Sequence, residues 1–143
     1  MPITQTLTTS FKVQLLRGAQ DFTAGTGDTF KMALYTSSAT LDATTTVYTT
    51  SNEVVGTGYT AGGNTLAISQ SPTSGGTTAF ISFANTSWNS ASFTCRGALI
   101  YNSSQANSAV AVFDFGSDKT VVAGTFTIQF PVADATNAVI RIA

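Results

Sequence analysis

The chain has 143 residues, and it carries six basic residues, seven acidic residues and no histidine. Charged residues make up 9% of the sequence, compared with about 25% in an average globular domain. Because the basic residues are few and scattered singly, we expect binding neither to nucleic acid nor to an anionic membrane. Histidine is the most common general base and metal ligand, so its absence argues against an enzyme, a metal site or a cofactor site.

The length and the apolar content favour one folded domain with a single core. Hydrophobic residues make up 43% of the chain and include ten phenylalanines, which supplies enough apolar surface for such a core. Threonine and serine fill most polar positions, and threonine packs well on a pleated sheet. No apolar run approaches the roughly 20 residues that span a bilayer. We therefore predict a mainly β protein.

The first nine residues are rich in threonine, include Pro2 and Ile3, and show no sustained periodicity. We expect residues 1–9 to form an extended arm that is either loose or laid against a neighbouring molecule. The arm has neither the basic nor the apolar region of a secretory signal, which favours synthesis in a cytoplasm. Residues 10–143 form the single domain that follows.

The segment SFKVQLLRG predicts one short helix at the start of this domain. Ser10 is an acceptable N-cap, and Gly18 is a suitable residue to end the helix. Phe11 and Leu15 are four residues apart and share one face of it.

From Thr29 onward the periodicity is that of strands. Phe30, Met32 and Leu34 alternate with other residues, which predicts a half-buried strand, and QSPTSGG reads as a turn. Short strands without intervening helices are typical of an antiparallel β-sandwich or jelly roll. The later strands are expected in Thr46–Tyr48, NTLAIS, TTAFISFAN, SASFTCRGALIYN, SAVAVFDFG, GTFTIQFP and NAVIRI. The sets expected to face the core are Phe30/Met32/Leu34, Phe93/Cys95/Leu99 and Phe126/Ile128/Phe130.

The stretch EVVGTGYTAGGNTLAIS (residues 53–69) contains the pattern G-x-G-x-x-A of a dinucleotide-binding fingerprint. That fingerprint needs a helix after the glycine turn, because the helix amides hold the pyrophosphate. Gly62 and Gly63 would break such a helix at its start. We therefore interpret the stretch as a connection between strands in which glycines adopt positive φ. Tyr59 is then either a clasp onto the sandwich or an exposed contact for a neighbour.

The carboxylates are spread along the chain, mostly beside Gly, Ser or Thr, where aspartate commonly bonds the local backbone in turns. Folding could still hide a paired-carboxylate glycosidase, and Asp114 with Asp118 could donate to a calcium site, although a turn is the simpler interpretation. Cys95 is expected to be a small buried hydrophobe. Trp88 either covers one end of the core or belongs to a sugar-stacking surface.

Long segments of the chain carry a resemblance to a known family. The stretch DTFKMALYTSSATLDATTTVYTTSNEVVGTGYTAGGNTLA and the later pieces CRGALIYNSS, AVAVFDFGSDKTVVAGTFTIQFP and NAVIRI resemble small structural proteins of tailed bacteriophages. Some of these proteins are similar to head decoration or cement proteins of the jelly-roll type. The resemblance covers roughly residues 11–142 and brings no catalytic motif.

The resemblance implies a non-enzymatic virion protein on the capsid surface, made in the host bacterial cytoplasm. Its implied partners are the major capsid protein and copies of itself, as a dimer or trimer. A tail, neck or baseplate protein and a host-surface carbohydrate-binding module remain as alternatives. The residues that we expect at an interface are Pro2, Ile3, Phe11, Leu15, Leu16, Arg17 and Tyr59.

Overall fold

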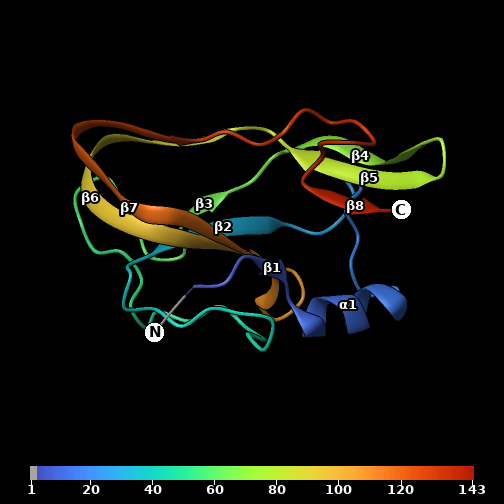
Figure 1. The fold of residues 1–143 in the computed structure, drawn as a ribbon, viewed down its shortest axis with the longest axis horizontal. Helices are drawn as coiled ribbons and strands as arrows, with labels where there is room; N and C mark the ends of the chain where they lie inside the picture. The colour runs from blue at the N-terminus through green and yellow to red at the C-terminus, as the bar shows by residue number, and fades with distance from the viewer. Residues whose placement is uncertain (1–2) are drawn as a thin grey trace.

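The computed structural model describes residues 3–143, which form an all-β domain of antiparallel sheets with one short helix, as predicted. A five-stranded sheet has the order β1-β7-β6-β2-β3, and a three-stranded sheet has the order β4-β5-β8 (Figure 1). No helix in this part of the chain is both long and apolar enough to cross a membrane. The elements are β1 Thr6–Leu7, α1 Thr9–Leu16, β2 Phe30–Tyr35, β3 Asn64–Thr65, β4 Ile68–Gly75, β5 Thr78–Phe83, β6 Thr86–Asn102, β7 Ser108–Ile128 and β8 Ile140–Ile142.

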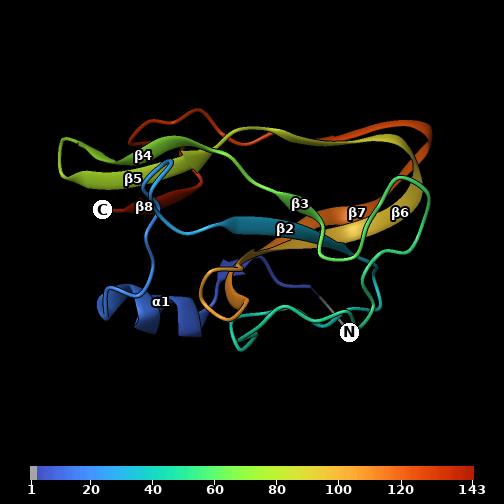
Figure 2. The same ribbon diagram turned by 180° about the vertical axis from the view of Figure 1, so that it is seen from behind.

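Strands β6 and β7 form one long hairpin that bends back over itself and contributes to both layers of the sandwich (Figures 1 and 2). The pairing register shifts at several points along it, including between Cys95 and Gly97. Such bulges increase the local bend of a strand pair without ending the pairing. For this reason SAVAVFDFG and the first five residues of GTFTIQFP, which we predicted as two strands, belong to the single strand β7, which ends at Ile128.

The main core lies between the two layers and contains most of the buried aromatic residues. A second, smaller cluster covers the opposite face of the five-stranded sheet and includes Ile3, Leu41 and Tyr101. Strand β2 lies between the two clusters, and its Ala33 and Tyr35 are fully buried on the second side. The prediction of a half-buried β2 was therefore wrong, because the chain covers both faces of this sheet.

The predicted core sets are correct up to the register shift in β6. Phe93 and Cys95 face the main core, but Leu99 lies in the second cluster. The register shift between Cys95 and Gly97 exchanges the faces on which the following residues lie. Ala98, instead of Leu99, therefore faces the main core. The set Phe126, Ile128 and Phe130 packs against the main core while remaining half-buried.

The segment 3–9 is laid on the domain itself, which corrects the expectation of an arm that is loose or bound to a neighbour. Strand β1 pairs with β7, and Ile3 forms a parallel bridge with Leu41. Thr8, fully buried, caps α1 by accepting a hydrogen bond from the Phe11 amide at 3.2 Å, so the N-cap is Thr8 rather than Ser10. The edge of β7 offers unpaired backbone groups, which explains why the segment docks there.

Two further predicted elements differ in the structure. The segment Thr46–Tyr48 forms only an isolated bridge, between Val47 and Ser108. Strand β4 continues through the predicted turn QSPTSGG to Gly75, with a register irregularity near Pro72. Because β4 is an edge strand, the missing amide of proline is tolerated there.

Candidate interaction site

Helix α1 lies over one end of the core and has apolar residues on both its inner and its outer side. Phe11 is fully buried, and its ring packs edge-on against Phe22 with centroids 6.0 Å apart. On the outer side, Val13 is 49% exposed and Leu16 is 90% exposed. A surface helix ordinarily presents polar residues to solvent, so these two exposed apolar side chains are unusual for the outer side of such a helix.

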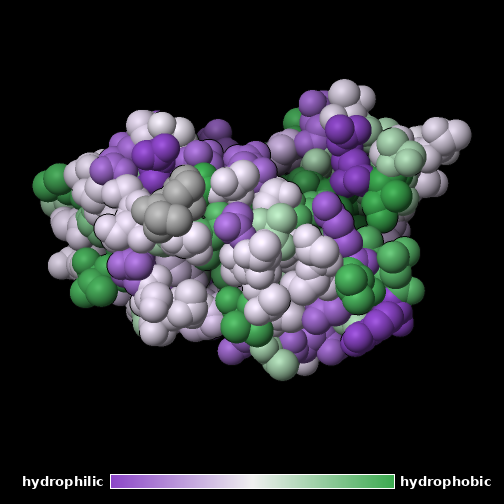
Figure 3. All heavy atoms as spheres, turned by 60° about the horizontal axis from the view of Figure 1, so that its bottom comes forward, coloured by the Kyte–Doolittle hydropathy of each residue, from purple (hydrophilic) through white to green (hydrophobic). Residues whose placement is uncertain are grey.

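A mostly apolar groove of about 180 Å³ separates α1 from the three-stranded sheet. In Figure 3, hydrophobic atoms gather at the end of the molecule that holds α1 and this sheet. Ile142 of the edge strand β8 borders the groove and is 54% exposed. The residues that line the groove include Phe11, Leu15, Phe22, Ala79, Ile81 and Ile142.

Charges of both signs flank the groove. Arg17 follows the last residue of α1, and Asp21 lines the groove a few residues later. Hydrogen bonds from the side chain and backbone of Thr23 hold the pKa of Asp21 below its usual value, so this carboxylate is ionised at neutral pH. Within residues 3–143 the one ion pair joins Arg96 to Asp114 at 3.0 Å, and neither Arg17 nor Asp21 takes part in it.

The opposite end of the sandwich holds a hydrogen-bonded cluster that we call the Glu53 clasp, consisting of Glu53, Tyr48, Tyr59, Tyr101 and Gly62. Glu53 is buried, and its Oε1 accepts a hydrogen bond from the Tyr48 hydroxyl at 2.6 Å. Its Oε2 accepts from the Tyr59 hydroxyl at 2.5 Å and from the Gly62 amide at 2.8 Å. The Tyr101 hydroxyl donates to the Gly62 carbonyl at 2.7 Å. The carboxylate thus organises the connection between β2 and β3.

Burial raises the pKa of the tyrosines in the clasp. The pKa of Tyr101 is raised to about 12, first by desolvation and then by the nearby Glu53 charge. Desolvation likewise raises the pKa of Tyr48 and Tyr59, and the hydrogen bonds to Glu53 raise them further. The hydroxyls are therefore neutral donors at physiological pH, as the carboxylate acceptor requires.

Tyr59 is held against the sandwich and is not an exposed contact, which decides between the two interpretations of this residue. Its hydroxyl also accepts a hydrogen bond from the Leu34 amide at 2.9 Å, and its ring packs against Trp88 and Phe93. The glycine loop around it contains no helix, and Gly58, Gly62 and Gly63 have positive φ as predicted, whereas Gly56 does not. At Gly63 a Cβ atom would also collide with the carbonyl oxygen of Met32, so glycine is required there.

Four of the aspartates accept hydrogen bonds from backbone amides close by in the sequence. Asp21, Asp42 and Asp134 lie in loops, as the turn interpretation predicted, whereas Asp114 and Asp118 lie within strand β7, so the turn predicted there was wrong. In each case the carboxylate accepts a hydrogen bond from the backbone amide two residues later, at 2.8–3.0 Å. These bonds, together with side-chain partners, lower the pKa of all four carboxyls. The four residues are Asp21, Asp42, Asp114 and Asp134. The searched part of the chain, residues 3–143, holds no group of three or more potential metal ligands.

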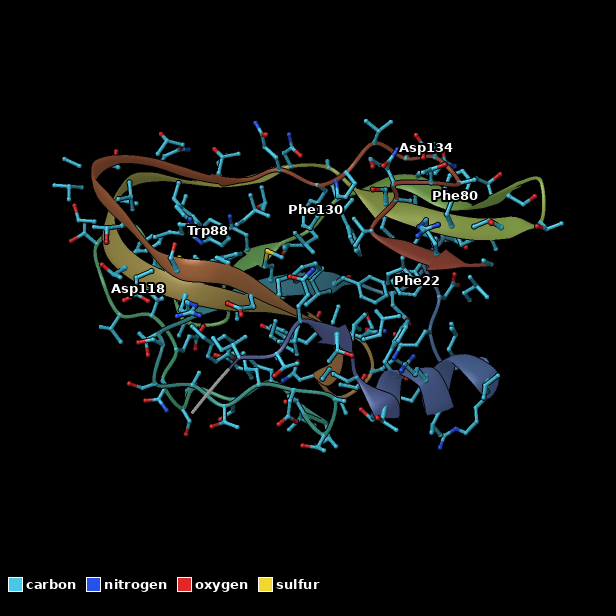
Figure 4. All side chains as sticks on the ribbon, viewed as in Figure 1. Phe22, Phe80, Trp88, Asp118, Phe130 and Asp134 are labelled. Atoms are coloured by element: carbon cyan, nitrogen blue, oxygen red, sulfur yellow. The ribbon has the colours of Figure 1, made fainter. Side chains whose placement is uncertain are left out.

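Trp88 and Cys95 both lie in the core. Trp88 is 3% exposed, and Figure 4 places it between the two layers, so the interpretation as a sugar-stacking residue was wrong. Its Nε1 has no hydrogen-bond partner. Cys95 is fully buried, and desolvation raises the pKa of its thiol to about 12, which agrees with a small buried hydrophobe.

The predicted interface residues that the structure describes occupy three different environments. Pro2 lies outside the described residues, whereas Ile3 and Phe11 are buried within the chain itself, because β7 and the core already cover them. Tyr59 belongs to the Glu53 clasp at the opposite end. Phe11 also lines the groove, together with the half-buried Leu15, and the exposed Leu16 and Arg17 follow Leu15 directly in the chain.

The sequence prediction missed three residues of this surface. Val13 lies three residues before Leu16 on the outer side of α1, and this spacing is visible in the sequence. Asp21 and Ile142 carry no comparable signal, because only the docking of β8 beside β5 brings residue 142 to the groove.

A comparison of the chain with protein-family models finds no match, and searches of curated proteins and of solved structures find none either.

Proposed function

We propose that the protein is a non-enzymatic structural protein of a bacteriophage virion, specifically a capsid decoration or cement protein. In this role it stabilises the head by binding the shell of the major capsid protein. The observation that carries the proposal is the resemblance of residues 28–67 and of segments between 95 and 142 to small structural proteins of tailed bacteriophages.

The scarcity of charge supports a role in a protein shell. Binding to a shell buries surface, and burying unpaired ions is costly, whereas threonine and serine are cheaper to desolvate. The chain has only 9% charged residues, and its polar positions are mostly threonine and serine. Symmetry then multiplies modest contacts between many copies into strong overall binding.

The way the chain uses its polar groups supports a structural role as well. Its only glutamate accepts three hydrogen bonds in the Glu53 clasp, and four of its six aspartates accept a hydrogen bond from the backbone amide two residues later. These groups hold connections in place, and the bent β6–β7 hairpin links both layers into one unit. A rigid unit loses little conformational entropy when it binds a repeating surface.

Mass spectrometry and cryo-electron microscopy of purified virions test this proposal. We expect the chain to be present in particles and to occupy ordered positions on the outside of the head. Particles that lack the protein should break at lower temperature or under milder osmotic shock. Density at the tail, neck or baseplate would favour the alternative location, and a chain found only in the lysate of infected cells would contradict both.

A further inference from the structure

We propose that the outer side of α1 and the adjoining groove form a surface for self-association. In this arrangement Leu16 of one copy enters the groove of a second copy, and Arg17 of each copy faces Asp21 of the other. The inference deepens the proposed function, on which its biological setting rests. It is tested separately, on the purified chain without any particle.

The distribution of exposed aliphatic residues points to this end of the molecule. Seven large hydrophobic residues of the described chain are exposed, and three of them, Val13, Leu16 and Ile142, lie on α1 or at the groove. Leu16 is 90% exposed, so its side chain projects into solvent with little cover from its own chain. Apolar side chains that gather around a hollow, with a polar rim, are typical of protein interfaces.

The surface contains both a projecting side chain and a recess for one. The groove of about 180 Å³ is lined mainly by apolar residues and has room for an aliphatic side chain. Leu15 lines the groove, and the exposed Leu16 follows it directly in α1, so the projection begins one residue from the recess although the two side chains point in different directions around the helix. A face that carries a projection beside a recess can bind another copy around a twofold axis, with each contact made twice.

Charge complementarity favours a second copy over an unrelated partner. The projection carries a positive charge, because Arg17 directly follows Leu16, and the recess carries a negative charge from Asp21. Neither residue forms an ion pair within residues 3–143. A twofold contact would therefore bring Arg17 and Asp21 of different copies together twice. Such matched charges at the rim also set the register of an interface.

Sedimentation velocity of the purified full chain over a concentration series tests the inference. We expect a concentration-dependent dimer, and we expect Leu16→Glu to raise its dissociation constant by about tenfold or more, because the substitution places a charge in the apolar recess. Val122→Glu is the matched control, since Val122 is also highly exposed but is not among the groove residues. This control should leave the dimer unchanged.

A charge exchange tests the pairing itself. Arg17→Asp and Asp21→Arg should each weaken the dimer when studied alone, whereas an equimolar mixture of the two variants should form mixed dimers. Because Asp21 also holds its turn through Thr23, Asp21→Asn provides a milder variant that removes the charge and retains an acceptor. Circular dichroism verifies that each variant is folded.

Three outcomes would overturn the inference. The first is a wild-type chain that stays monomeric at its highest soluble concentration, and the second is a dimer that tolerates Leu16→Glu. The third is a monomer whose binding to particles is lost in Leu16→Glu, which would assign the groove to the capsid shell. That third result would leave the proposed virion function intact.

Discussion

The two ends of this sandwich are closed by different kinds of interaction. At the end held by the Glu53 clasp, a buried carboxylate, tyrosine hydroxyls and backbone groups satisfy one another. At the α1 end, aromatic rings cover the core. The ring of Phe22 stacks on Phe30 with centroids 4.4 Å apart and packs edge-on against Phe83 with centroids 6.3 Å apart. The first end uses its polar groups internally, whereas the second leaves an apolar groove and unpaired charges.

This difference follows from the directionality of the two interactions. Hydrogen bonds to a buried carboxylate require defined positions of every partner, so the clasp holds a long connection in a single conformation. Apolar packing is not directional and leaves its outermost residues available to any complementary surface. We therefore expect that a change of a single group lowers the free energy of unfolding more at the clasp end than at the α1 end. We expect the α1 end to be the one that binds another molecule.

The largest expected effect is that of a substitution at Gly63, at the clasp end, and Gly76 at the other end provides the comparison. Both Gly63, in the loop of the clasp, and Gly76, at the β4–β5 turn, have positive φ. Gly63→Ala should destabilise the protein by about 4 kcal/mol or more, because its Cβ would collide with the Met32 carbonyl. Gly76→Ala meets no atom within 4 Å and should cost only about 1–2 kcal/mol of backbone strain. Denaturant unfolding measures both, and equal losses would contradict a tightly fitted clasp.

The second prediction concerns the aromatic end. Phe22→Ala should lower the free energy of unfolding by about 3 kcal/mol, at the low end for a buried phenylalanine, because the neighbouring groove lets the site relax. Val122→Ala, at a position that is 78% exposed, is the control and should change stability by less than about 0.5 kcal/mol. Chemical denaturation followed by circular dichroism checks both values. A loss for Phe22→Ala as small as that of the control would show that the ring does not close this end.

The third prediction tests the carboxylate of the clasp. Glu53→Gln replaces one accepting oxygen with an amide nitrogen, so a tyrosine hydroxyl or the Gly62 amide loses its acceptor. We expect a loss of about 1–3 kcal/mol in the free energy of unfolding. Asp118→Asn, at an exposed position, provides a control for removal of a charge alone. If both variants are equally stable, the clasp contributes nothing beyond its packing.

The last prediction concerns alkaline pH, which should also act on the clasp end. The pKa of Tyr101 rises from 10.0 to about 12 in the folded protein, and those of Tyr48 and Tyr59 are also raised. The folded state thus favours neutral tyrosine, so this contribution to stability is complete below pH 10 and is lost as the pH rises through about 12. Unfolding curves across this range, combined with tyrosinate absorbance, measure the effect. Ionisation of all tyrosines near pH 10 without loss of stability would contradict it.

The sequence predicted the local features of both ends more successfully than the distant residues that pack against them. The alternation in Phe30–Leu34 identified β2, and the glycine-rich stretch was recognised as a connection between strands in which glycines adopt positive φ. The presence of a short helix with Phe11 inside was also predicted correctly. In each of these cases the signal lies within a few neighbouring residues, where backbone preference and side-chain spacing act directly.

The site was predicted only in part, for reasons that lie in distant contacts. Leu15, Leu16 and Arg17 were among the expected interface residues, but Ile3 was expected at an interface although it packs beneath its own chain against Leu41. The sequence could not show that β7 would receive the N-terminal segment. Nor could it show that Ile142, near the other terminus, would border the same groove as α1.

By itself, the sequence determined the class of fold, the short helix, the glycine-rich connection between β2 and β3 and the low content of charge, because these depend on composition and on short-range periodicity. Only the tertiary structure decided which tyrosines meet Glu53, which face Leu99 occupies and where the apolar groove opens. These features depend on the register shift in β6 and on the bend of the β6–β7 hairpin. A shift of one residue exchanges every side chain that follows between two faces, and no local pattern in the sequence specifies it.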